Sequence, residues 1–458
     1  MKEHPLPMTH APSRPIHRLA ALVVALLVLL GAPLAAQAFE IRKVTSPGGI
    51  AAWLVEDHTI PLIAMEYSFA GGSAGDSADR QGLATFLSGM LDEGAGDIDS
   101  AAFQRRIEDL AVKLSFDANR DDFTGSLQTL SENRAAAFDL LRLALTQPRF
   151  DAEPLERMRS QFVLGINDDA EDPEQIASQA WMHTVFGNHP YGRPSKGDVA
   201  GIKAVTSADL RALTARLFAR DGLMVAVVGD IDAAALSGEL DKVFGALPDK
   251  SGMPEVQPVT PILGPIVQII ERDIPQSVIR FGSQGIARDD PDFIPAYVMN
   301  FILGDGGFGS RLTEQVREKR GLAYSIYTAL YPLDHAALFY GATATVNEQA
   351  GQTLAILRAE LKRMAEDGPT EQELAEAKTY LTGSYALRFD SNRKIAGQLL
   401  AIQREKLGID YITRRNSLIQ AVSLDDVRRM ARRIIDSDAL VVTIVGKPKD
   451  LKPVGKPG

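Results

Sequence analysis

The chain has 458 residues, of which 45% are hydrophobic and 24% charged, with a formal net charge of −10, no cysteine and seven histidines. The hydrophobic content excludes a disordered protein, and the length exceeds that of one ordinary domain. The absence of cysteine excludes disulfide scaffolds, thiolate zinc sites, iron–sulfur clusters and cysteine nucleophiles, so any catalysis must use hydroxyl, carboxylate, lysine, arginine or histidine side chains.

Residues 1–38 are predicted to be a secretory signal peptide. Basic residues precede an unbroken apolar run at 19–30, and Ala36-Gln37-Ala38 follows as an A-x-A cleavage site. The run is shorter than the roughly 20 residues of a membrane span, so we expect cleavage and no stable membrane insertion afterwards. An uncleaved anchor is the alternative. No cysteine follows the run, which excludes a lipoprotein.

The exported chain is acidic. Removing residues 1–38 leaves 46 basic and 58 acidic side chains, a net charge of −12. This charge disfavours nucleic acid as a partner and is compatible with basic peptides. The predicted signal peptide implies a periplasmic or otherwise exported protein. The exported chain keeps four histidines, which are His58, His183, His189 and His335. No two of them have the i, i+4 spacing of a helix-borne zinc pair, so no metal site is expected in this chain.

The first predicted strand, at 62–69, runs into Gly71-Gly72-Ser73-Ala74-Gly75, which matches the G-x-S-x-G nucleophile elbow of serine hydrolases. In an elbow the helix follows the serine at once, whereas here Asp76-Ser77-Ala78-Asp79 intervenes. A glycine turn is the favoured interpretation, and a serine hydrolase that uses Ser73 is the remote alternative.

An internal repeat divides the rest of the chain. Residues 205–229 align without a gap on residues 422–446, with nine of 25 positions identical, and each copy predicts a capped amphipathic helix followed by a strand that ends at glycine. Further helices are predicted at 134–146, 151–167 and 350–366. The expected fold is α+β, with two similar layered domains, each a sheet with helices on one face. The expected boundaries are 39–246 and 266–450, a proline-rich linker at 247–265 and a tail at 451–458.

The second half contains a glycine-rich segment, Gly304-Asp305-Gly306-Gly307-Phe308-Gly309, which matches G-x-G-x-x-G. A dinucleotide site needs this motif between a strand and a helix. The preceding residues 291–303 predict a buried helix, so a flexible glycine loop is the favoured interpretation.

Residues 82–91, GLATFLSGML, resemble the active-site helix of the pitrilysin and mitochondrial-processing-peptidase family of zinc peptidases. Active members have the inverted motif H-x-x-E-H there, in which two histidines bind zinc and the glutamate activates water. Thr85, Ser88 and Gly89 occupy these positions. The family's third ligand, a glutamate on a later helix, falls at Gly165. The resemblance spans nearly the whole exported chain and implies one half of a clamshell.

The same resemblance implies a substrate-binding pair. The family has an arginine and a tyrosine seven residues apart in its second domain, and Arg317 and Tyr324 in VREKRGLAYS match both type and spacing. A guanidinium and a phenol hydroxyl are suited to hold the charge that develops on a peptide carbonyl. By analogy with the family's glycine loop, Gly306, Gly307 and Gly309 are expected to contact peptide.

The resemblance therefore predicts a non-catalytic subunit of a heterodimeric zinc peptidase. A homologous partner with H-x-x-E-H would supply zinc and the general base, and this chain would supply Arg317 and Tyr324. The alternative is a non-enzymatic peptide-binding or scaffold protein.

Overall fold

The computed structural model describes residues 40–455, and the predicted signal peptide lies outside them. From Ile41 onward the chain forms one compact unit. Within the described residues, no helix combines the length and the hydrophobicity that crossing a membrane requires.

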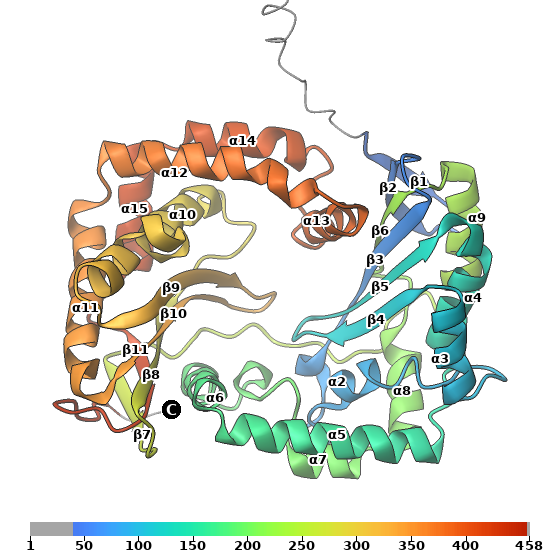
Figure 1. The fold of residues 1–458 in the computed structure, drawn as a ribbon, viewed down its shortest axis with the longest axis horizontal. Coiled ribbons are helices and arrows are strands. Elements are labelled where there is room, and N and C mark those ends of the chain that lie inside the picture. Colours follow the sequence, from blue (N-terminus) through green and yellow to red (C-terminus); the bar gives the residue numbers. More distant parts are fainter. Residues whose placement is uncertain (1–39, 456–458) are drawn as a thin grey trace, which may run out of the picture. The chain divides into compact units, whose positions relative to one another are not determined.

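The first half is built on a six-stranded sheet with the order β1-β2-β6-β3-β5-β4 (Figure 1). Only β2 and β6 pair in parallel; the other neighbours are antiparallel. The strands are β1 (Arg42–Thr45), β2 (Ala51–Glu56), β3 (Leu62–Ala70), β4 (Lys113–Ala118), β5 (Asp122–Leu130) and β6 (Met224–Gly229).

The second half repeats this sheet with five strands in the order β7-β11-β8-β10-β9. The five strands correspond in order to β2-β6-β3-β5-β4 of the first sheet, and only β1 has no counterpart. The parallel pair β7 and β11 therefore corresponds to the parallel pair β2 and β6. The strands are β7 (Ile266–Ile270), β8 (Gln276–Gln284), β9 (Ala323–Pro332), β10 (Ala337–Val346) and β11 (Val441–Val445). The predicted α+β fold of two similar layered units is confirmed.

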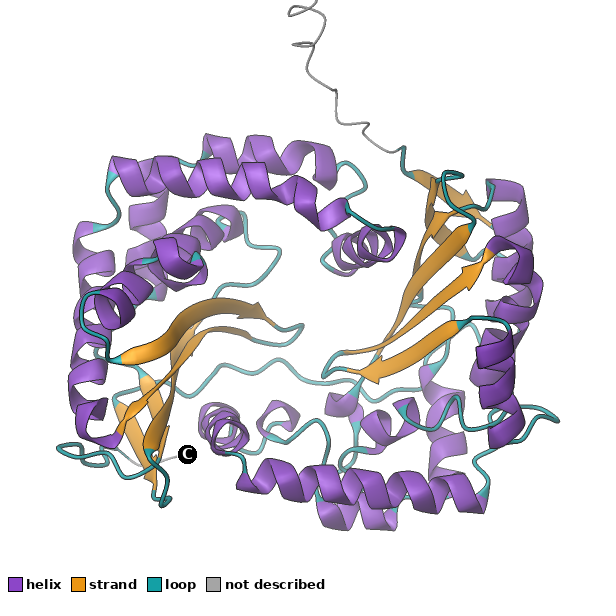
Figure 2. Ribbon diagram, viewed as in Figure 1, coloured by secondary structure: helices purple, strands orange, loops and turns teal. Residues whose placement is uncertain are grey.

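Helices of the same half cover one face of each sheet (Figure 2). Alternation along β3 explains the layering, because Ile63, Met65, Tyr67 and Phe69 point into the first core whereas Glu66 lies on the opposite face. The first-half helices are α2 (Leu83–Ser88), α3 (Ser100–Asp109), α4 (Arg134–Thr146), α5 (Ala152–Glu171), α6 (Pro173–Phe186), α7 (Val199–Ala204), α8 (Ser207–Leu217) and α9 (Ala233–Phe244). The second-half α-helices are α10 (Phe293–Asn300), α11 (Ala350–Asp367), α12 (Glu371–Gly383), α13 (Asn392–Arg404), α14 (Tyr411–Ala421) and α15 (Leu424–Ile434).

The two halves exchange helices across their sheets. Helix α6 of the first half packs on β8 and β11, and α13 of the second half packs on β3 and β6 (Figure 1). Trp181 Nε1 donates to the Val441 carbonyl at 2.9 Å, and Gln403 Nε2 donates to the Val225 carbonyl at 3.0 Å. Helix α13 begins 219 residues after α6, close to the separation between the repeated segments 205–229 and 422–446. The two helices are therefore equivalent elements of the internal repeat.

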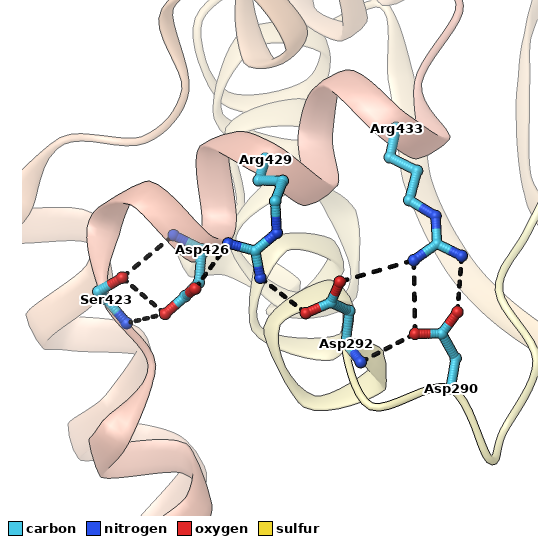
Figure 3. A network of polar contacts seen from close by, with 6 residues as sticks. All are labelled: Asp290, Asp292, Ser423, Asp426, Arg429 and Arg433. Atoms are coloured by element: carbon cyan, nitrogen blue, oxygen red, sulfur yellow. Dashed lines mark hydrogen bonds and ion pairs between the residues drawn. The ribbon is translucent and has the colours of Figure 1, made fainter.

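The repeated helix–strand unit has the expected caps. Thr206 and Asp209 form a capping box on α8, and Ser423 and Asp426 form the equivalent box on α15. Figure 3 shows ion pairs that extend from the α15 capping box to the start of α10. Arg429 binds Asp426 of the box and also Asp292, and Arg433 binds Asp290. Side chains this exposed contribute little stability individually, but together they fix where α15 meets α10.

Candidate functional site

The helix that resembles the zinc-binding helix is α2, and a buried carboxylate holds its start. Asp76 accepts hydrogen bonds from the backbone N–H groups of Gly82 and Ala84 at 3.0 and 3.1 Å. Burial raises the pKa of Asp76 to about 7, although these N–H groups oppose the change. Gly82 has φ +86°, and its backbone packs so closely on Lys196 that a side chain would not fit. These contacts give a structural role to residues around the motif.

The hydroxyl groups at the zinc-motif positions are engaged within the protein. Thr85 Oγ1 donates to the Ser195 carbonyl and Ser88 Oγ to the Thr85 carbonyl, each at 2.7 Å. Neither side chain offers the imidazole or carboxylate that zinc prefers.

The remaining two motif positions lie beside or on α5. A Cβ at Gly89 would lie 2.8 Å from Met158 Cε and 3.2 Å from Phe162 Cε2, whereas a Cβ at Gly165 would meet open space. Phe162 is itself held by an edge-to-face contact with Phe86, at 5.0 Å between centroids. Within residues 40–455, no group of three or more His, Asp or Glu side chains could hold a metal ion. The residues present do not fit zinc.

Restoring the motif letters should therefore not restore the metal site. We expect the variant T85H/S88E/G89H/G165E to retain less than stoichiometric zinc after gel filtration, because a side chain at position 89 requires Met158 and Phe162 to move. Adding M158A and F162A should increase the zinc content, measured by mass spectrometry of the metal. Stoichiometric zinc in the fourfold variant would contradict this account.

Arg317 and Tyr324, the pair that the resemblance implies, lie in contact with one another. Arg317 lies on η6 (Thr313–Glu318), a π-helix, and its Cζ is 4.6 Å from the ring centroid of Tyr324 at the start of β9. Tyr324 is 83% exposed. The β9–β10 register shifts near Ser325, so Tyr324 and Tyr327 are both exposed although they are three residues apart.

A third residue, Phe308, completes this cluster. Its ring centroid also lies 4.6 Å from Arg317 Cζ, and its side chain is 66% exposed. Among the described residues, no hydrogen bond or ion pair engages the Arg317 guanidinium, so its N–H donors are available to a ligand. Sequence analysis missed Phe308; the available signal was an aromatic residue between two glycines.

The glycines expected to contact peptide differ in accessibility. Positions 307 and 309 would each place a Cβ in open space, and Gly307 has φ +58°. Gly306 is less open, because a Cβ there would lie 2.7 Å from the Phe301 carbonyl oxygen. The open backbone is therefore at Gly307 and Gly309, on either side of Phe308.

The other two motifs do not assemble a site. Ser73 lies in η1 (Ser73–Gly75), a short 3₁₀ turn that no helix follows directly. His189 Nδ1 accepts from the Tyr191 N–H and Nε2 contacts the Gln257 carbonyl, so this histidine holds the linker. The glycine segment ends a π-helix, η4 (Phe301–Asp305), and does not follow a strand.

An ion pair between a buried arginine and a half-buried glutamate anchors the segment that carries Phe308 and Arg317. Arg311, which is 7% exposed, binds both carboxylate oxygens of Glu373 on α12, at 2.5 and 2.8 Å, and the Gly368 carbonyl. Burial acts to raise the pKa of Glu373, but hydrogen bonds from Arg311 and Thr370 outweigh it and lower the pKa to about 2.

This pair should make stability depend on pH. Because the folded-state pKa is below the ordinary glutamate value of about 4.3, the stabilisation is present above pH 4.3 and disappears as pH falls toward 2. We expect E373Q to reduce the free energy of unfolding at pH 7 by about 3 kcal/mol, since Arg311 loses its countercharge. The difference from wild type, measured by urea unfolding, should shrink below pH 4.3. E371Q, at an exposed position on the same helix, is the matched control.

Two family models and several relatives match this chain. The model described as Insulinase (Peptidase family M16) matches residues 54–198, and that described as Peptidase M16 inactive domain matches residues 204–381. A Helicobacter pylori protein named non-peptidase homolog YmxG is 27% identical over 86% of this chain and 91% of its own. A Streptomyces coelicolor protein named an uncharacterized zinc protease is 26% identical, covering 90% of each chain.

Comparison with solved structures agrees with the family models. The crystal structure of a peptidase M16 inactive domain from Pseudomonas fluorescens superposes with a TM-score of 0.84 at 29% identity, covering 91% of this chain and all of that one. The two family models follow one another along the chain, and the second begins at residue 204, before α8 and β6 of the first half. The chain therefore belongs to peptidase family M16.

Proposed function

We propose that this protein is the zinc-deficient subunit of an exported heterodimeric peptidase. A homologous partner with an intact H-x-x-E-H motif supplies the zinc and the general base. This chain binds the peptide backbone through Arg317 and Tyr324. The single observation that carries the proposal is a guanidinium that no acid among the described residues engages, beside an exposed tyrosine, in a protein whose α2 offers no metal ligand.

The chemistry of these side chains supports a role in carbonyl binding. Hydrolysis of a peptide bond builds negative charge on the carbonyl oxygen, and donors already aimed at that oxygen lower the barrier. Among the described residues, no acid engages the donors of the Arg317 guanidinium. The Tyr324 hydroxyl adds a neutral donor. Together they bind and orient a carbonyl while the partner performs the hydrolysis.

The names of its relatives support the assignment of a non-catalytic role. The H. pylori relative is named a non-peptidase homolog, and the superposed P. fluorescens structure is named an inactive domain. Export rests on the apolar run at 19–30 and the Ala36-Gln37-Ala38 site. Amino-terminal analysis of protein recovered from the periplasm should find Phe39 as the first residue.

Reconstitution tests the proposal. The purified chain alone should cleave no peptide from a mixed peptide library, and adding a co-exported homologue with H-x-x-E-H should produce cleavage. If no such homologue forms a complex, and the chain still binds peptides in a manner that R317A weakens, the protein is a peptide-binding protein without catalysis. Cleavage by the chain alone that a fluorophosphonate probe blocks would instead identify a serine hydrolase.

A further inference from the structure

Phe308 occupies an unusual position for a large apolar side chain. It is two-thirds exposed, stands between Gly307 and Gly309, and makes its cation–π contact with Arg317. An exposed phenylalanine on a glycine-rich turn gains little from burial and loses conformational freedom when it is fixed. Its contact with Arg317 is therefore the interaction that explains its position.

The turn that carries Phe308 is fixed at one end. Ser310, which is 1% exposed, donates through Oγ to the Gly307 carbonyl at 2.8 Å, and its backbone N–H bonds the same carbonyl. Arg311 follows and is held by Glu373. The chain can therefore hold the Phe308 ring against Arg317 although both neighbours of Phe308 are glycines.

Arg317 needs such support because no acid within residues 40–455 orients it. A long arginine side chain without a partner samples many rotamers, and each must be given up when a ligand binds. Aromatic rings attract the face of a guanidinium and leave its N–H edge free, whereas a carboxylate would occupy that edge. Phe308 and Tyr324 provide two such rings, each 4.6 Å from Arg317 Cζ.

We infer that Phe308 is a positioning residue of the peptide site. Its ring holds the Arg317 guanidinium by the face, so that the N–H edge meets the peptide carbonyl without prior rearrangement. This role rests on the proposed function insofar as the ligand is a peptide carbonyl. The contact between Phe308 and Arg317 can be tested without any partner.

The first measurement uses the chain alone. Hydroxyphenylglyoxal modifies accessible guanidinium groups, and mass spectrometry of tryptic peptides gives the rate at Arg317. F308A should raise this rate roughly twofold to fivefold, the factor expected for loss of one exposed cation–π contact, and F308W should restore the wild-type rate. I60A, an exposed apolar residue in the first half, is the control. An unchanged rate in F308A overturns the inference.

The second measurement uses the reconstituted complex. F308A should lower kcat/KM roughly twofold to fivefold, F308W should restore it, and F308A should have no further effect in an R317A background, because Phe308 acts through Arg317. Equal losses from F308A in both backgrounds overturn the inference. If R317A itself leaves kcat/KM unchanged, the proposed function fails, and the modification rate at Arg317 still decides whether Phe308 holds the guanidinium.

Discussion

Arg317→Ala should lower the turnover number of the reconstituted peptidase by about 100-fold to 1,000-fold, the usual effect of removing one preorganised donor to a developing oxyanion. The reason is geometric: among the described residues no hydrogen bond or ion pair engages the Arg317 guanidinium, which lies beside the exposed Tyr324. A contact made mainly in the transition state affects kcat more than KM. Steady-state kinetics on one cleaved peptide would measure both constants.

Controls separate this effect from a loss of structure. Arg105 on α3 is also exposed and has no side-chain partner among the described residues, so R105A should leave the kinetics unchanged. Y324F removes the hydroxyl alone and should reduce kcat while the ring still contacts Arg317. A fully active R317A complex, with unfolding equal to wild type, would contradict the assigned role.

Trp181→Ala should reduce the free energy of unfolding by about 3–5 kcal/mol, the range for truncating a buried aromatic residue. Trp181 is 3% exposed, and its indole contacts Tyr340 and fits against Gly282. Its hydrogen bond to Val441 would also be lost. The change removes the main aromatic contact that α6 makes with the sheet of the second half.

Fluorescence makes this contact directly measurable. The chain has only two tryptophans, so W53F leaves Trp181 as the single emitter. Urea unfolding of W53F should follow the contact between the halves, and circular dichroism of W181A should report the loss of stability. W181F retains an aromatic ring without the donor and should lose less. A cost below 1 kcal/mol for W181A would mean that α6 adds little to the joining of the halves.

Local pattern was sufficient to predict the layered fold. The capped helix and strand of each repeat are encoded within 25 residues, so α8 with β6 and α15 with β11 could be read directly. Two contacts could not be predicted in this way. The exchange of α6 and α13 depends on how whole sheets pack, and nothing within either helix specifies which sheet it covers.

The same limit applies to the site. Arg317 and Tyr324 were found because the family motif fixes their spacing, whereas Phe308 reaches Arg317 through a turn whose shape depends on Ser310. The crowding of Gly89 by Met158 and Phe162 is likewise invisible in sequence, because α2 and α5 are separated by more than 60 residues. The sequence shows that the zinc-binding side chains are absent, whereas the packing around Gly89 determines whether a histidine would fit there.

The exchange of helices α6 and α13 suggests how the duplicated chain arose. Two equivalent units that each place the same helix on the other's sheet have the arrangement of a domain-swapped dimer. Fusing two such copies into one gene preserves every contact of the dimer and frees the copies to diverge.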